Sequence, residues 1–362
     1  MEHGAVAALE AGGIAAYHQY IRKKWILLGL LTLLMFVLML ICVNAGAATL
    51  NPFEVLRTLL GQGDERVATV IWRIRMPRVI AAVVAGAGLS IAGCVMQNTL
   101  KNPLASPSTL GISHAATFGA NLAIIVLGAG SILHTAGDAV SISNPYLVTT
   151  CAFVCSMSVT LIVLTLAKTR GFTPESIVLA GVALGSLFTA GTTILQYFAP
   201  DIKIAAAIFW TFGDLGRASW SEVLILSVVV VASVVYFFFQ RWNYNALSSG
   251  EEVAKSLGVN TDRVRLTGLV LTSLITAIAV SFLGMIGFIG LIGPQIMRRM
   301  IGADHRFLIP ASLLAGSIIL LASDTLARTT ISPVVLPVGA LTSMLGGPMF
   351  LYLLLRGVSS KR

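Results

Sequence analysis

Residues 284–306, GMIGFIGLIGPQIMRRMIGADHR, form the stretch that decides the fold. Glycine recurs at every third position of its first half, so the backbone there can bend or approach a neighbouring helix closely. Pro294 interrupts the same half, and proline is tolerated inside a membrane helix where adjacent protein satisfies the carbonyl that it frees. Arg298 and Arg299 follow, as is typical of the cytoplasmic mouth of a span. We therefore expect a closely packed transmembrane helix here.

The composition of the whole chain has the same character. Of 362 residues, 56% are hydrophobic and only 11% are charged, and the mean hydropathy is +0.89. A soluble globular protein carries about 25% charged residues, so the composition predicts a polytopic membrane protein. The net charge of +9 does not indicate nucleic-acid binding, because the lysines and arginines lie between apolar runs rather than on one face.

Long apolar runs separated by short polar segments predict an all-α protein with about ten transmembrane helices. The first run, residues 25–48, is long enough to span, so we expect a retained helix rather than a signal peptide. Residues 266–297 contain no Asp, Glu, Lys or Arg and exceed the ~20 residues needed for one crossing, which predicts two helices with a turn near residues 284–287. The other expected spans cover residues 79–97, 110–133, 145–167, 177–198, 223–240, 307–323 and 336–355.

Basic residues orient these spans. Most of the 24 lysines and arginines fall on alternate connections, which places both termini in the cytoplasm. The chain then divides into a cytoplasmic N-terminal segment (residues 1–24), a transmembrane permease domain (25–356) and a cytoplasmic tail (357–362). The connection at residues 49–78, with one short surface helix expected, falls on the outer side and yet carries a basic cluster. This exception requires a reason.

The end of that cluster, residues 72–78 (WRIRMPR), contains Arg73, Arg75 and Arg78. Such a positive patch can receive acidic groups from a docking protein. The alternative is that these arginines and Trp72 anchor the span to lipid headgroups, which is a common use of both residue types.

Residues 241–265, RWNYNALSSGEEVAKSLGVNTDRVR, form the longest hydrophilic stretch inside the hydrophobic body. The pattern predicts a short helix over residues 251–257, capped by Ser249 and ended by Gly258. A short rigid element on a cytoplasmic loop is suited to receiving motion from a partner ATPase. The alternative is a solvated loop without a partner.

Polar residues and glycines on the apolar helices are candidates for a pathway or for helix packing. Many such polar side chains only hydrogen-bond a neighbouring helix, which contributes ~0.6 kcal/mol on average, and we expect this for most of them. A lone histidine such as His114 is more often a packing residue than a metal ligand. Asp324 and Arg328 are spaced i,i+4 and can pair with each other. The interior candidates are Gln97, Asn102, Pro103, His114, Asn121, Gln196, Gly287, Gly290, Gly293, Pro294 and Gln295.

Several motifs resemble, in order, those of the permease subunits of ABC importers for ferric siderophores, haem and cobalamin. They are R-x-P-R at residues 75–78, G-A-G-L-x-x-x-G-x-x-x-Q at 86–97, N-P-L-A-x-P-x-x-L-G at 102–111 and G-x-I-x-F-x-G-L-x-x-P at 284–294. The resemblance covers residues 25–356. One departure is Gln295, which stands where the family usually has histidine.

The resemblance implies a type II ABC importer permease that forms a homodimer with the pathway at its interface. Two ATP-binding subunits would engage its cytoplasmic loops, and one extracytoplasmic substrate-binding protein would dock outside. Arg75 and Arg78 would meet glutamates of the binding protein, and a third family arginine corresponds to Arg328, while Arg73 has no firm counterpart. Residues 254–259 resemble the family's coupling loop, so the expected ATPase contacts are Glu251, Ala254, Ser256, Leu257, Gly258 and Val259.

Missing motifs limit the chemistry. The sequence has no phosphate-binding G-x-x-x-x-G-K-[ST] motif, so ATP and Mg²⁺ are expected on the partner ATPases, and the chain is expected to be a transport subunit without catalytic residues. No H-E-x-x-H or C-x-x-C motif indicates a metal site, and the four cysteines fall in apolar runs.

Two rival classes of membrane protein fit the sequence less well than the importer. An ion-coupled secondary transporter would normally place an ionisable relay within its helices, and a membrane scaffold explains the glycine-rich, proline-broken helices less well. We expect a multi-pass protein of a prokaryotic cell (inner) membrane. Ferric siderophore is the first substrate expectation on family frequency, with haem and cobalamin as alternatives.

Overall fold

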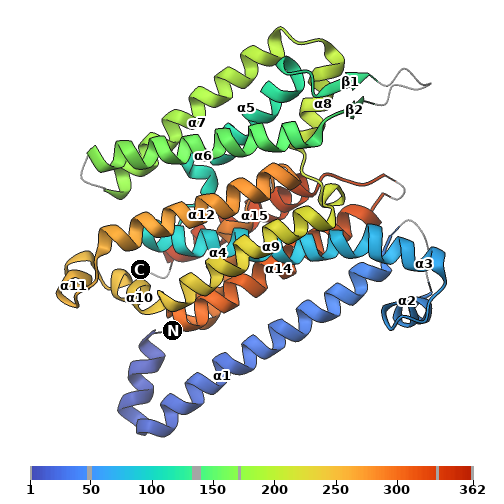
Figure 1. Cartoon of the computed structure of the whole chain (residues 1–362). Coiled ribbons are helices and arrows are strands. Elements are labelled where there is room, and N and C mark those ends of the chain that lie inside the picture. The colour runs from blue at the N-terminus through green and yellow to red at the C-terminus, as the bar shows by residue number, and fades with distance from the viewer. Residues whose placement is uncertain (1, 47–50, 133–139, 170–172, 332–333, 360–362) are drawn as a thin grey trace.

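The computed structural model describes residues 2–46, 51–132, 140–169, 173–331 and 334–359, and nearly all of them are helical (Figure 1). Seven helices in this part are long and apolar enough to cross a membrane. They are α1 (Glu2–Asn44, with its span at Tyr17–Asn44), α4 (Met76–Thr99), α6 (Pro145–Thr169), α7 (Pro174–Tyr197), α9 (Trp220–Phe239), α12 (Thr261–Leu283) and α14 (His305–Thr329).

Three further apolar helices are shorter. They are α5 (Ile112–Asn121), which continues into the π-helical η3 (Leu122–Val126), α13 (Ile289–Ile301), and α15 (Val338–Ser359) with its apolar part at Val338–Tyr352. The all-α prediction is therefore confirmed, and the ten expected spans correspond to seven long helices and three short ones. The remaining helical elements are α2 (Pro52–Leu59), α3 (Glu65–Thr69), η1 (Val70–Arg75), η2 (Pro107–Leu110), α8 (Asp201–Thr211), η4 (Leu215–Arg217), α10 (Arg241–Ser248) and α11 (Glu251–Ser256).

The structure differs from the sequence prediction at several boundaries. The connection expected at residues 49–78 is helical from Glu65 onward, and α3, η1 and α4 form one apolar segment, Glu65–Thr99. A short antiparallel pair, β1 (Gly130–Ile132) and β2 (Val140–Ile142), was not predicted; it flanks residues 133–139, which lie outside the described part. Helix α15 continues to Ser359, into the segment assigned to the tail.

The charge-free run 266–297 divides where its glycines predicted a turn. Gly284 ends α12 with a φ of +78°, and Phe288 precedes α13 with a φ of +64°. Both values lie in the left-handed region, which glycine adopts at little cost and which is uncommon for phenylalanine. The turn therefore separates α13 from α12, and α13 packs against α4 and α14 as a short helix of its own.

Helix α4 lies at the centre of the bundle, and 83% of its apolar window is buried. It contacts α9, α12, α13 and α14, and small residues allow the backbones to approach closely. A Cβ atom added to Gly86 would meet the backbone of Gly316 on α14, and one added to Gly93 would meet the backbone of Gly290 on α13. Ser90 also donates to the Ser312 carbonyl at 2.6 Å, which ties α4 to α14.

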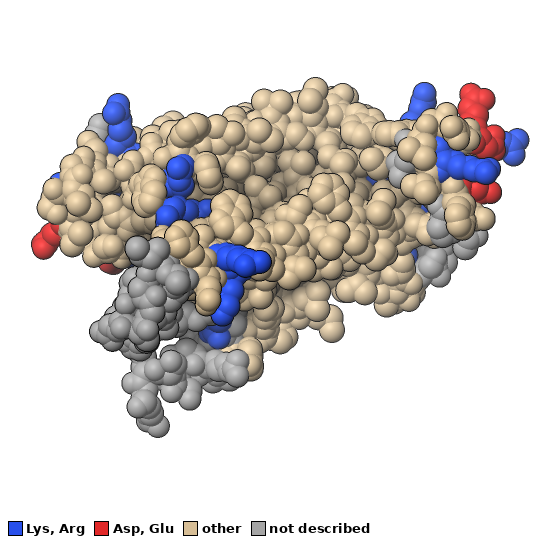
Figure 2. Space-filling view, turned by 90° about the horizontal axis from the view of Figure 1, so that it is seen from below, with Lys and Arg blue, Asp and Glu red and all other residues tan. Residues whose placement is uncertain are grey.

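The two ends of the bundle carry different elements. Helices α2, α3 and α8 and the β-pair lie at one end, called here the α2–α3 end, and α10 and α11 lie at the other, the α10–α11 end (Figure 1). Charged side chains gather at these two ends, and a broad band without charge separates them on the face in Figure 2. This distribution is that of a protein whose middle lies in lipid.

Candidate docking, pathway and coupling sites

The arginine cluster at the α2–α3 end is built around a buried carboxylate. Asp324, only 1% exposed, accepts from Arg78 Nε at 2.8 Å and from Arg328 Nε at 3.0 Å. Arg78 also lies 3.3 Å from Asp214, in the segment that joins α8 to η4. The expected i,i+4 pairing of Asp324 with Arg328 is therefore present, and one acid joins the start of α4 to the end of α14.

Arg75 and Arg328 hold the end of α1. Arg75 Nη1 donates to the carbonyls of Val43 and Asn44, both at 2.8 Å. Arg328 donates to the carbonyls of Ala45 at 2.7 Å and Cys42 at 3.1 Å. The last carbonyls of a helix lack intrahelical donors and carry partial negative charge, so two guanidinium groups are favourable there. Both arginines are buried, and in this conformation they face α1 rather than solvent.

Arg73 is the docking candidate whose side chain is exposed. The neighbouring Trp72 carbonyl accepts from Trp220 Nε1 at 2.8 Å, which fixes this turn against the start of α9. Arg57 and Arg66, on α2 and α3, are exposed at the same end. Sequence reasoning noted the basic cluster but did not select these two, although their position on the connection was the available signal.

Gln97, Pro103 and Gln295 come together where α4 meets α13. Gln295 Nε2 donates to the Pro103 carbonyl at 2.8 Å and to Gln97 Oε1 at 3.2 Å, and Gln97 Nε2 donates to the Gly290 carbonyl at 3.3 Å. Gly290 is the residue four positions before Pro294, which has no N–H to donate to it. Gln97 therefore supplies, from a neighbouring helix, the hydrogen bond that the proline removes.

Two glycines of α13, Gly290 and Gly293, and Gly287 in the turn before it face neighbouring helices. A Cβ atom on Gly290 would lie 2.9 Å from the Leu89 carbonyl oxygen, and one on Gly287 would lie 3.1 Å from Ser343 Oγ on α15. A Cβ atom on Gly293 would meet the Ser90 side chain. These contacts support a packing role for the three glycines.

His114 lies apart from that cluster. Its Nδ1 is 3.1 Å from Thr189 Oγ1 on α7, and it lines an open cavity of about 450 Å³ with the hydroxyl residues Ser108, Ser186 and Thr193. Asn102 is not in this cavity; its side chain accepts from the Leu104 amide at 2.9 Å and forms a local turn. The other interior amides, Gln196 and Asn121, bond each other at 2.9 Å, as expected for helix packing.

The predicted coupling loop contains two short helices, and its cap differs from the prediction. Ser249 caps the C-terminus of α10, whereas Gly250, with a φ of +127°, precedes α11, which ends at Ser256. The prediction of Ser249 as the cap was wrong because only glycine readily adopts this backbone conformation. Gly258 has a φ of +80° and follows the helix, as expected.

Helix α11 presents an apolar surface. Leu257 is 67% exposed and Val253 is 46% exposed, whereas Ala254 is fully buried against the body. Glu251 lies 3.0 Å from Lys255 and 3.1 Å from Arg265. Hydrogen bonds from Lys255 and then Arg265 hold the pKa of Glu251 below its usual value.

Polar side chains connect the coupling helices to α4, α12 and α14. Asn98 of α4 donates to the Tyr244 carbonyl at 2.9 Å, and buried Arg265 donates through Nε to the Thr99 carbonyl at 3.2 Å. Asn245 of α10 accepts from the His305 amide at 2.8 Å and donates to Asp304 at 2.9 Å. Sequence reasoning missed Asn98, Asn245 and Arg265, because their partners are distant in sequence.

Across residues 2–46, 51–132, 140–169, 173–331 and 334–359, no group of three or more His, Cys, Asp or Glu side chains is placed to hold a metal ion.

A largely helical bundle with seven membrane-length apolar helices in its described part, an arginine cluster at one end and short exposed helices at the other is the architecture of a multi-span membrane protein. The chain belongs to the FecCD transport family, whose model matches residues 33–356. It is therefore a permease subunit of an ABC importer, a type of transporter in which separate subunits carry the ATPase activity.

Individual relatives agree with this assignment. The chain is 53% identical to a protein of Methanocaldococcus jannaschii named as an ABC transporter permease, over 94% of this chain and 97% of that protein. It is 37% identical to the hemin transport system permease protein of Yersinia pestis, over 91% of this chain and 96% of that protein. A solved structure described as an inward-facing conformation of a metal-chelate type ABC transporter matches with a TM-score of 0.79 and 28% identity, covering 91% of this chain and 99% of that one. Other relatives are named for Fe(3+)-citrate, vitamin B12 or siderophore import.

Proposed function

We propose that this permease imports a ferric siderophore or a similar iron chelate. Relatives named for Fe(3+)-citrate and siderophore import support this choice. Haem and cobalamin are the alternatives, because relatives named for hemin and vitamin B12 are similarly close. The hydroxyl-lined cavity beside His114 is the candidate contact for the substrate, since exposed hydroxyls on a membrane helix favour a polar pathway over lipid.

The proposed complex contains two copies of this chain, two ATP-binding subunits that hold ATP and Mg²⁺, and one extracytoplasmic substrate-binding protein. The ATPases would engage α11, and the observation that carries this assignment is the exposed pair Val253 and Leu257 on a helix bonded to the body. Two exposed apolar side chains one helical turn apart on a polar loop are suited to a protein contact. Both termini and the α10–α11 end would then lie in the cytoplasm, and the α2–α3 end would face the binding protein across a prokaryotic inner membrane.

Docking of the binding protein is assigned to Arg73, Arg75, Arg78 and Arg328. Arg73 is available at the surface, whereas Arg78 would have to exchange Asp214 or Asp324 for a partner carboxylate. Arg75 and Arg328 would act mainly by fixing the end of α1 beside this surface. The proposed segments remain a cytoplasmic start (residues 1–24), a permease domain (25–356) and a tail (357–362).

The test is uptake by proteoliposomes that contain the permease, its ATPases and its binding protein. Ferric siderophore, haem and cobalamin are supplied separately, each with ATP and with a non-hydrolysable analogue. We expect ATP-dependent uptake of the ferric siderophore that persists when ionophores collapse ion gradients. Preferred uptake of haem or cobalamin would overturn the substrate assignment, and uptake without ATP that stops on adding ionophores would favour the secondary-transporter class.

A further inference from the structure

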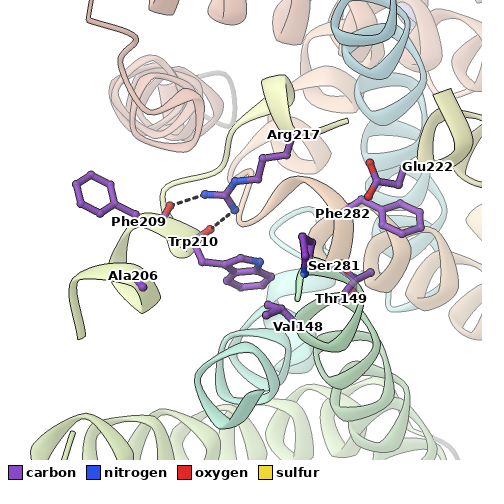
Figure 3. A pocket seen from close by; sticks show the side chains of 10 residues that line it. Val148, Thr149, Ala206, Phe209, Trp210, Arg217, Glu222, Ser281 and Phe282 are labelled. Carbon is purple, nitrogen blue, oxygen red and sulfur yellow. Dashed lines mark hydrogen bonds between the residues drawn. The ribbon is translucent and has the colours of Figure 1, made fainter. Parts of the chain in front are cut away.

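A cavity of about 430 Å³ lies at the α2–α3 end, between α6, α8, α9 and α12 (Figure 3). Val148, Ala206, Trp210 and Phe282 provide apolar walls, and its volume is within the ~300–1,000 Å³ typical of ligand pockets. Its lining shares no residue with the His114 cavity or with the cluster around Gln97. The proposed import mechanism leaves this cavity without a role.

Ser281 gives the cavity an unsatisfied hydrogen-bonding group. The residue is 1% exposed, and in the described part of the chain its Oγ has no hydrogen-bond partner. Figure 3 places its side chain beside Val148, Thr149 and the Trp210 indole. Leaving a buried hydroxyl unpaired costs about 1–3 kcal/mol, so an oxygen of a bound molecule would be favoured at this position.

Arg217 supplies a cation at the same cavity. Its two terminal nitrogens donate to the carbonyls of Phe209 at 2.7 Å and Trp210 at 3.1 Å (Figure 3). Burial lowers the pKa of Arg217, and within the described residues no carboxylate lies at ion-pair distance from it. Glu222, also in the lining, accepts from the Ser219 amide at 2.7 Å and so completes the cap of its own helix. A guanidinium has five N–H donors, so Arg217 can still bind an anionic oxygen.

The position of the cavity selects the kind of ligand. Pro145 begins α6, Ser281 lies two residues before the end of α12, and Glu222 lies in the first turn of α9, so the cavity is level with one membrane surface. Only 33% of the apolar window of α6 and 28% of that of α9 are buried within this chain, so the outer faces of the helices on either side are available to lipid chains. Phosphate and ester oxygens of phospholipids lie at this depth, where Trp is enriched.

We propose that this cavity binds one phospholipid of the leaflet at the α2–α3 end. One acyl chain lies along Val148, Trp210 and Phe282, an ester oxygen bonds Ser281, and the phosphate lies beside Arg217. The volume accommodates one chain and not a whole two-chain lipid. The second chain therefore stays in the bilayer.

Trp210 is a built-in reporter for the test, because it is 3% exposed and forms a cavity wall. The full chain, with its other four tryptophans changed to phenylalanine, is placed in nanodiscs whose phosphatidylcholine carries brominated acyl chains. We expect bromine to quench Trp210 strongly, and Ala206→Phe, which fills the cavity, to reduce this quenching at least twofold. A matched variant that retains only Trp25, which is 63% exposed, should be quenched equally with and without Ala206→Phe.

A second measurement covers the polar contacts and does not depend on cavity filling. Native mass spectrometry of the wild-type chain should show one retained phospholipid per chain, and Ser281→Ala should weaken its retention roughly two- to tenfold, the range of one hydrogen bond. Diacylglycerol, which lacks the phosphate, should be retained less well than phosphatidylcholine, and inorganic phosphate should not displace the lipid. Unchanged Trp210 quenching in Ala206→Phe, together with no retained lipid in the wild type, would overturn the proposal. Equal retention of diacylglycerol, or displacement by inorganic phosphate, would overturn the assignment of the lipid phosphate to Arg217.

Discussion

Arg78 and Asp324 join the start of α4 to the end of α14 through an ion pair of 2.8 Å, with the carboxylate only 1% exposed. These helices also touch along their lengths, through the contact of Gly86 with Gly316. At the opposite end of the bundle, Asn98 and Asn245 bind α10 to the same two helices. The pair α4–α14 therefore connects the proposed docking surface directly to the proposed coupling helices.

Asp324→Asn should destabilise the permease because it removes the buried charge that pairs with Arg328, which is buried, and with Arg78, which is mostly buried. Breaking a buried ion pair by removing one partner costs about 3–5 kcal/mol, so thermal unfolding in nanodiscs should begin at a clearly lower temperature. Asp64→Asn is the matched control, since Asp64 is exposed at the same end and makes no side-chain cap. Equal unfolding of the two variants would show that Asp324 does not stabilise this end.

Arg73→Glu should weaken docking of the binding protein without affecting insertion. An exposed ion pair contributes about 0.2–1 kcal/mol, so reversing the charge should weaken affinity severalfold, and added salt should reduce wild-type affinity. The measurement is binding-protein affinity in nanodiscs, with Arg263→Glu at the α10–α11 end as the control. If Arg73 only anchors the span to lipid, docking by correctly inserted protein will be unchanged.

Leu257→Asp should impair binding of the ATPase subunits. The Leu257 side chain is 67% exposed, so an aspartate at this position remains in contact with solvent and the permease should still fold. Pull-down of the ATPases and substrate-stimulated ATP turnover should both fall. Leu60→Asp, at a leucine that is 71% exposed at the other end, should leave the pull-down intact; equal losses in both variants would contradict the coupling assignment.

Gly290→Ala should destabilise the contact of α13 with α4. The added methyl would lie 2.9 Å from the Leu89 carbonyl oxygen, and overpacking costs about 1–3 kcal/mol. Gly347→Ala is the control, because a methyl there meets no atom within 4 Å. We expect a lower midpoint of unfolding for Gly290→Ala only. An unchanged midpoint for Gly290→Ala would mean that α13 can shift to accommodate the methyl group without loss of stability.

The sequence predicted the helices well because apolar runs and their interruptions are local signals. The turn at Gly284 was predictable for the same reason, since charge-free length and glycine spacing both lie within one stretch. The direction in which the Arg75 side chain points was not predictable, because its hydrogen-bond partners are the carbonyls of Val43 and Asn44 at the end of another helix. Likewise, no local pattern revealed that Arg265 reaches the Thr99 carbonyl. Long-range hydrogen bonds decide which polar residues are available to a partner, and they require the fold.

Gln97 and Pro294 provide the sharpest test of the packing around α13, because one is expected to compensate for the other. Gln97→Met keeps the side-chain volume but leaves the Gly290 carbonyl without its donor, at a cost of about 1–3 kcal/mol. Pro294→Ala supplies a backbone N–H that can bond the same carbonyl from within α13. In the Pro294→Ala background, Gln97→Met should therefore cost clearly less.

The two single variants and the double variant form a cycle, measured as unfolding midpoints of the purified permease in nanodiscs. Residues that share a hydrogen-bond network show interaction energies of about 0.5–3 kcal/mol. We expect an interaction energy in this range, with the double variant less destabilised than the sum of the two single variants. Gln295→Met in the same backgrounds is the control, because Gln295 donates to Gln97 and to the Pro103 carbonyl, whereas Gln97 is the donor to the Gly290 carbonyl. Its cost should not depend on Pro294. Strict additivity of Gln97→Met and Pro294→Ala would show that Gln97 does not replace the missing backbone hydrogen bond.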